Sequence, residues 1–159
     1  MNTLFFMYEL VSAVFAKGGD TEIVHKRSDF KKPIERHTTP HSYEDIRNVF
    51  MRDCIVLSPQ QYIADRFIMN NRPLFLEFQS MDSVHQGDTV LLNPSDIMSY
   101  GGTHNEGGVY ITTFTGMMFV IPAELKAFAH AHDFHRKHGR GTPTPVFNQS
   151  PLRKKARVA

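Results

Sequence analysis

The segment between residues 92 and 128 constrains the fold of this 159-residue chain more than any other part of it. From residue 109 to 114 the side chains alternate between two faces, with Val109 and Ile111 on the same side. This is the period-two pattern of a strand. Gly116 supplies the positive φ that a tight hairpin needs. The segment therefore predicts three short strands and then a helix, at residues 92–100, 108–116, 118–122 and 124–128.

Other parts of the chain add helices and strands to this unit. Residues 3–16 are apolar nearly all round and end at Gly18-Gly19, so they predict a buried helix. Ser42 is a good N-cap for a second helix. The remaining expected elements are helices at 43–53 and 59–69 and strands at 22–25, 74–79 and 88–92. Together they predict an α+β fold, a small antiparallel β-sheet over residues 74 to 121 with three or four packed helices.

Composition divides the chain into three regions. We expect a helical N-terminal region at 1–72, with a polar connector over 20–41, and a β-rich module at 73–138. Residues 139–159 hold too little apolar material to fold alone and predict a flexible basic tail. The short segment 54–57 separates two expected helices, which form either a helix-turn-helix unit or an αα-hairpin packed on the sheet. The second of these helices offers Gln60, Gln61 and Arg66, but Asp65 lies among them and would repel phosphate, which favours the αα-hairpin.

Charge and cysteine content narrow the class of protein. The formal net charge of +2 is too close to neutral to indicate a nucleic-acid partner by itself. Cys54 is the single cysteine, which excludes an internal disulfide and fits a reducing compartment. The apolar run near the N-terminus is too short to span a bilayer, contains Glu9 and has no basic residue before it. We therefore expect a cytoplasmic protein that does not associate with a membrane.

Five pieces of the sequence follow one another in the order found in a known family. They are Asp96-Ile97-Met98-Ser99-Tyr100, Val109-Tyr110-Ile111-Thr112-Thr113, Gly116, Glu124-Leu125-Lys126 and Phe134-His135-Arg136-Lys137-His138. In this order the chain resembles the core of a LytTR-type DNA-binding domain over residues 74 to 148, and the resemblance implies a strand at 134–138. The family's closing hairpin has no counterpart after Asn148. The Leu92-Asn93-Pro94 start and the hairpin are also similar to the FlbD family of small flagellar proteins, the weaker alternative.

The LytTR resemblance implies a sequence-specific DNA-binding transcriptional regulator, with no catalytic activity and no cofactor. Its base-reading positions correspond to His104 and Asn105 in the hairpin loop. Arg136 and His138 correspond to positions on the family's last strand, and Asn148 corresponds to the asparagine that follows it, at a different spacing. Basic side chains near the C-terminus are candidates for a phosphate-binding arm, namely Arg140, Arg153, Lys154, Lys155 and Arg157.

Two other functions stay open. A protein-binding adaptor or inhibitor would use the apolar helix 3–16 and exposed aromatic side chains as a partner or homodimer surface, without nucleic acid. A metal-dependent hydrolase would use the histidine run 130–138, because His132, His135 and His138 would lie on one side of a helix. No cysteine or carboxylate is placed in the sequence to complete such a site. We therefore predict no metal site, and we expect these histidines to lie on a solvated, basic helix end.

Overall fold

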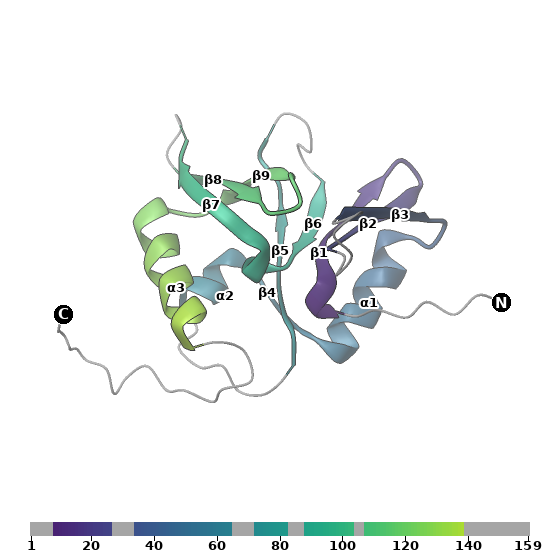
Figure 1. Ribbon diagram of the computed structural model, residues 1–159, viewed down its shortest axis with the longest axis horizontal. Helices are drawn as coiled ribbons and strands as arrows, with labels where there is room; N and C mark the ends of the chain where they lie inside the picture. Colours follow the sequence, from purple (N-terminus) through teal and green to yellow (C-terminus); the bar gives the residue numbers. More distant parts are fainter. Residues whose placement is uncertain (1–7, 27–33, 65–71, 83–87, 104–106, 139–159) are drawn as a thin grey trace.

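The computed structural model describes residues 8–26, 34–64, 72–82, 88–103 and 107–138. Within these residues nine strands form two sheets, and three α-helices accompany them, so the predicted α+β class is confirmed (Figure 1). The strands are β1 Val11–Lys17, β2 Asp20–Lys26, β3 Ile34–Thr39, β4 Ile55–Leu57, β5 Leu74–Gln79, β6 Thr89–Leu92, β7 Ile97–Gly102, β8 Gly108–Thr113 and β9 Met118–Pro122. The helices are α1 Tyr43–Asp53, α2 Pro59–Ala64 and α3 Leu125–His138, with 3-10 turns η1 Tyr8–Leu10 and η2 Pro94–Asp96.

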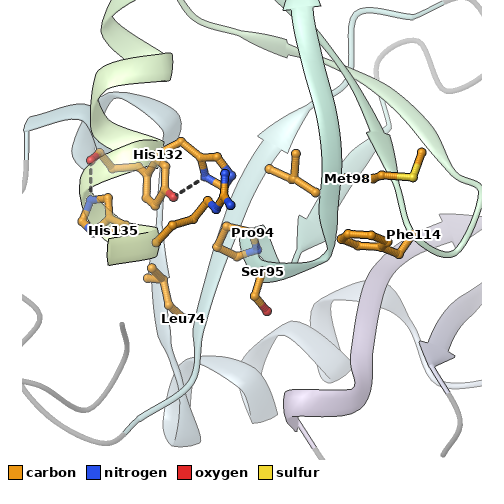
Figure 2. Close-up of a pocket in the computed structure, with 10 residues that line it drawn as sticks. Leu74, Pro94, Ser95, Met98, Phe114, His132 and His135 are labelled. Atoms are coloured by element: carbon orange, nitrogen blue, oxygen red, sulfur yellow. Dashed lines mark hydrogen bonds between the residues drawn. The ribbon is translucent and has the colours of Figure 1, made fainter. Parts of the chain in front are cut away.

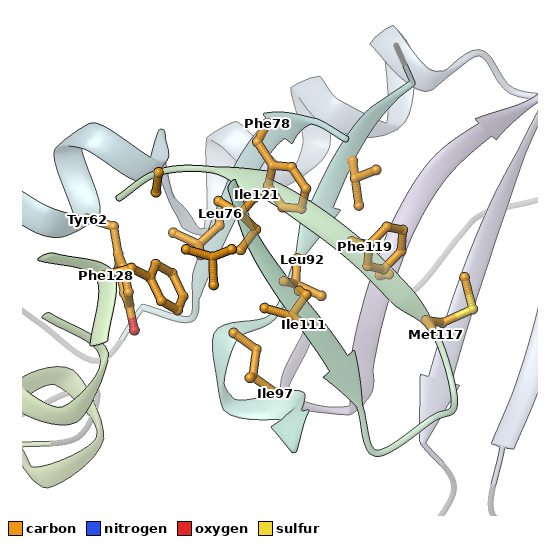
Figure 3. Close-up of a cluster of buried hydrophobic side chains, with 14 of the residues drawn as sticks. Tyr62, Leu76, Phe78, Leu92, Ile97, Ile111, Met117, Phe119, Ile121 and Phe128 are labelled. Atoms are coloured by element: carbon orange, nitrogen blue, oxygen red, sulfur yellow. The ribbon is translucent and has the colours of Figure 1, made fainter. Parts of the chain in front are cut away.

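The larger sheet has six strands in the order β3-β2-β1-β6-β5-β4 and forms the middle layer of the fold. Its neighbouring strands are antiparallel except for the parallel pair β4 and β5. Helix α1 packs on one face of this sheet, where Phe50 lies in a cluster with Val14 and Leu91. On the other face Ala13 and Leu92 belong to a larger cluster that includes the second sheet, β7-β8-β9, with α2 and α3 (Figure 3).

Residues 3–7 of the predicted helix 3–16 lie outside the described residues, and the rest of that prediction is wrong, because residues 11–17 form β1 at the centre of the larger sheet. Strand β1 is covered on both faces, and its first five residues are all buried. A strand of this kind has a continuous apolar sequence, which periodicity alone cannot distinguish from a buried helix. Gly18-Gly19 is therefore a two-residue hairpin turn between paired Lys17 and Asp20, with φ of 63° at Gly18, and not a helix stop.

The expected polar connector over 20–41 is also replaced by strands, since it contains β2 and β3. The predicted strand at 22–25 lies within β2, and the predicted helix 43–53 coincides with α1. Residues 55–57 form β4 between α1 and α2, so neither a helix-turn-helix unit nor an αα-hairpin is present there. A run of Ile, Val and Leu is typical of a buried strand. Helix α2 accounts for 59–64 of the predicted helix 59–69, and the rest of that prediction lies outside the described residues.

The two predicted regions 1–72 and 73–138 contribute to one sheet. Strands β1 to β4 come from the first region, whereas β5 and β6 come from the second. Strands β5 and β6 match the predictions at 74–79 and 88–92 closely, but residues 97–122 form a separate sheet where we expected a single one. The predicted tail, 139–159, lies outside the described residues.

A group of buried polar side chains joins the two sheets. Asp96, at the end of η2, is fully buried and accepts hydrogen bonds from Ser12 Oγ on β1 and from Thr115 Oγ1, the latter at 3.1 Å. Its other carboxylate oxygen lies 3.6 Å from Lys26 Nζ. A buried carboxylate is stable only when such donors compensate for the loss of hydration. Asn93 Nδ2 adds a hydrogen bond of 3.0 Å to the carbonyl of Val11, so η2 is held against β1.

Candidate functional site

A cavity of about 420 Å³ lies between α3, η2 and the beginning of β7. One part of its wall is apolar and comprises Leu74, Pro94, Ile97, Met98 and Phe114. The other part is polar and comprises Tyr62, His132, His135 and Arg136, with Ser95 beside them. In Figure 2 the two histidines project from α3 on one side of Pro94, while Met98 and Phe114 lie on the other side. The site therefore combines an apolar wall with one that carries hydrogen-bonding groups and a cation.

The polar wall is organised around Tyr62 of α2. Its hydroxyl lies 2.8 Å from Nδ1 of His132, and its backbone carbonyl accepts a 3.0 Å hydrogen bond from Nε2 of His135 (Figure 2). The rings of Tyr62 and His135 are also stacked, with centroids 4.3 Å apart. His132 and His135 are buried, so our expectation that both would lie on a solvated helix end is wrong. Their spacing of three residues places both on the face of α3 that packs against α2.

Burial fixes the charge state of this wall. Burial first, and then the positive charge of Arg136, lower the pKa of His132 to about 4. Burial also raises the pKa of Tyr62 above its ordinary value. Both groups are therefore neutral near pH 7, and neither has a pKa matched to proton transfer at that pH. The pair holds the cavity wall in position, and Arg136 adds a positive charge to the lining.

Exposed apolar side chains continue from this cavity onto the second sheet. Met98, Tyr110, Phe114 and Met118 are between 40% and 61% exposed, and we call these four residues the apolar patch. Met98 lies where the β7–β8 register shifts, and such a bulge turns a side chain away from its regular direction. The backbone N–H of Phe114 donates to the carbonyl of Asp96 at 2.9 Å, which anchors the turn that carries its ring.

Tyr110 and Met118 form the outer part of the apolar patch. The hydroxyl of Tyr110 lies 2.6 Å from the sulfur of Met118, across neighbouring strands β8 and β9. The alternation predicted from the sequence is present here, because Val109 and Ile111 are fully buried on the opposite face. An exposed cluster of methionine and aromatic side chains is a frequent property of protein-binding surfaces.

Of the ten residues predicted to contact DNA, the structure describes the side chain of Arg136, which lies in the cavity wall. His138 is the last residue of α3, and its side chain lies outside the description. The other eight predictions fall on residues outside the described ranges, namely His104, Asn105, Arg140, Asn148, Arg153, Lys154, Lys155 and Arg157. The set of DNA contacts therefore stays a prediction, because the structure describes the side chain of one of its members.

The strand that the LytTR resemblance implies at 134–138 is instead the end of α3. Glu124 Oε1 accepts a hydrogen bond of 3.1 Å from the N–H of Ala127 and so caps the first turn of this helix. Three alanines, at 127, 129 and 131, favour helix over strand, and no glycine or proline interrupts the helix before residue 139. The local sequence therefore continues the helix through the positions where the resemblance requires a strand.

In the part of the chain that the structure describes, the helices are all too short or too polar to cross a bilayer. Among these same residues, the one group of three side chains with metal-ligand spacing lies on β2 and β3, not on α3. Comparison of the chain with family models, with curated proteins and with solved structures finds no match.

Proposed function

We propose that this chain is a protein-binding module that receives a segment of a partner protein on the apolar patch and in the adjoining cavity. The exposure of Phe114, at 61%, together with that of Met98 carries the proposal, because both side chains also line the cavity. Burial of such side chains favours association, and an aromatic side chain beside a pocket is typical of the energetic centre of an interface. The partner surface therefore differs from the one expected at residues 3–16, because residues 11–15 are buried inside this chain.

The lining of the cavity indicates the chemistry of the partner. Leu74, Pro94 and Ile97 offer an apolar floor for a bulky apolar side chain. Arg136 contributes a positive charge, and no acidic side chain is among the described residues of the lining. A carboxylate next to the apolar side chain would pair with this guanidinium, which binds carboxylates well. We therefore infer that the partner segment carries Asp or Glu beside a large aliphatic or aromatic residue.

A random peptide library displayed on phage tests this proposal, with the full chain as bait. Selected peptides should share a bulky apolar residue next to an acidic one. Phe114→Ser should weaken their binding at least tenfold in fluorescence anisotropy, which corresponds to about 1.4 kcal/mol or more. Arg136→Gln should reduce the preference for acidic residues. Met51→Ser is the matched control, because Met51 is 43% exposed on α1 and lies outside the cavity.

Two results would contradict the proposal. The first is a selection that yields no shared sequence pattern. The second is a set of peptides that bind the Phe114→Ser and Met51→Ser variants equally well. If the Arg136→Gln variant selects acidic residues as strongly as the wild type does, the inference that the partner segment carries Asp or Glu is rejected.

DNA binding, as in a LytTR-like transcriptional regulator, is a second candidate function. The observation that favours it is the pair of exposed basic residues Arg136 and Lys137 at the end of α3, which leads into the basic residues of 139–159. Asp133 Oδ2 lies 3.2 Å from Lys137 Nζ and reduces the local positive charge. Arginine and lysine on one surface contact phosphates without regard to sequence.

Anisotropy with random-sequence duplex DNA tests this candidate between about 50 and 200 mM salt. DNA binding predicts submicromolar affinity at the low end, a steep loss with added salt, and weaker binding by a His104→Ala/Arg136→Ala double variant. The matched control is Arg52→Ala, an exposed arginine on α1. If the wild-type protein does not bind at the lowest salt, DNA binding is rejected and the protein-binding proposal is unaffected.

A further inference from the structure

A second group of chemically active side chains lies on the β2–β3 pair at the edge of the larger sheet. His25 is directly opposite Glu35 in the strand register, and Ile23 is opposite His37. Side chains two residues apart on a strand lie on the same face, so His25, Glu35 and His37 share one face of this pair. The sequence gives little sign of this, because the three residues lie in a stretch that resembles a polar connector.

The three side chains are close enough to bind one ion. The rings of His25 and His37 have centroids 4.9 Å apart, and Nε2 of His37 lies 3.2 Å from a carboxylate oxygen of Glu35. One ligand atom from each of the three residues can be chosen so that all lie within 4.8 Å of one another. Tetrahedral zinc with bonds of 2.0–2.1 Å needs about 3.3 Å between ligand atoms. A small rotation closes this difference, since the side chain of His37 is 52% exposed and has room to move.

We propose that His25, Glu35 and His37 form a binding site for one divalent transition-metal ion, with zinc as the expected occupant. Two imidazole nitrogens and one carboxylate oxygen suit zinc and other first-row ions, whereas calcium and magnesium prefer sites made of oxygen atoms. Three protein ligands leave a fourth position for water. The pairing of β2 with β3 fixes the backbone positions of the three ligands before the ion arrives, which favours binding.

The ion would also stabilise the edge of the sheet. β3 is paired on one side by β2 and has no strand on its other side among the described residues. Two ligands come from β3 and one from β2, so a bound ion connects these strands through side chains in addition to the backbone ladder. A ligand that binds only the folded state raises the melting temperature. This site is independent of the proposed protein-binding surface, which is formed by other elements.

Titration of the full chain with Co²⁺ and Zn²⁺ tests the proposal. We expect one Co²⁺ per chain with the visible absorption bands of a low-coordinate ion, displacement by Zn²⁺, and an increase in melting temperature. Glu35→Gln preserves size and hydrogen-bonding atoms but removes the charge, so its affinity should fall at least tenfold. His37→Ala should reduce affinity by more. His130→Ala is the matched control, because His130 is exposed on α3 and should leave binding unchanged.

Far-UV circular dichroism of the metal-free variants shows whether each substitution preserves the fold. If a variant does not fold, NMR of the wild-type protein still tests the proposal. Bound Co²⁺ should broaden the imidazole signals of His25 and His37 before those of the other seven histidines. The proposal is overturned if the wild-type chain binds no ion. It is also overturned if Glu35→Gln and His37→Ala bind as tightly as His130→Ala, or if Co²⁺ broadens other histidines first.

Discussion

Acidification should remove part of the stability of this protein through His132. Burial, and then the positive charge of Arg136, lower its pKa to about 4 in the folded chain. In the unfolded chain a histidine has a pKa of about 6.5. Because the folded-state pKa is the lower one, the unfolded chain binds this proton more readily between the two values. The free energy of unfolding therefore falls as the pH falls through this window, and the contribution of His132 is complete only above it.

The size of the effect follows from the same two pKa values. Each pKa unit corresponds to about 1.4 kcal/mol, so protonation of the unfolded chain costs roughly 2 kcal/mol of stability at pH 5 and about 3 kcal/mol at pH 4. A domain of ordinary stability has about 5–15 kcal/mol in total. The titration of this one buried imidazole is therefore a substantial part of the expected acid sensitivity.

Urea denaturation at pH 7 and pH 5 measures this contribution in the wild-type chain and in His132→Gln. Glutamine retains a hydrogen-bonding group beside Tyr62 but does not titrate. We expect the variant to be less stable at pH 7 by about 1–2 kcal/mol, and to lose about 2 kcal/mol less than the wild type on acidification. His130→Gln, two residues earlier and exposed, should keep the wild-type pH dependence. Equal losses in His132→Gln and the wild type would refute the reasoning.

Three further substitutions test the packing in equilibrium urea denaturation. Asp96→Ala removes the acceptor of Ser12 and Thr115 and should cost about 3–5 kcal/mol; a loss under 1 kcal/mol would show that the buried group contributes little. Phe50→Ala empties the fully buried centre of the α1 interface and should also cost about 3–5 kcal/mol, and a smaller loss would mean that neighbouring side chains refill the space. Gly116→Ala should cost about 1–2 kcal/mol, because the φ of 82° is unfavourable although space for the methyl group exists; no loss would contradict this.

Elements whose signals are local could be predicted from the sequence. Ser42 Oγ accepts a hydrogen bond from the N–H of Asp45 at 3.1 Å, so the predicted N-cap of α1 is confirmed. The hairpin of β8 and β9 was also predictable, since its alternation and the positive φ of Gly116 both depend on neighbouring residues. These features need no knowledge of the rest of the chain.

Features that depend on distant residues could not be predicted in this way. β1 is apolar on both faces because it lies between two layers, and the sequence around Val14 does not contain that information. The burial of His132 depends on Tyr62, which is 70 residues away in the chain. Periodicity showed that His132 and His135 share a face of a helix, but it could not show that α2 covers that face. The cavity was missed for the same reason.

The central position of β1 has a consequence for the synthesis of this protein. β2 leaves the ribosome directly after β1 and can pair with it at once, but the other edge of β1 must wait for β6. Ser12 waits even longer for Asp96, which is 84 residues later in the chain. During this interval the nascent chain carries an apolar strand with an open edge, a state prone to aggregation. We therefore expect a nascent chain that ends before β6 to be a substrate for chaperones, and one that extends beyond α3 to be released from them.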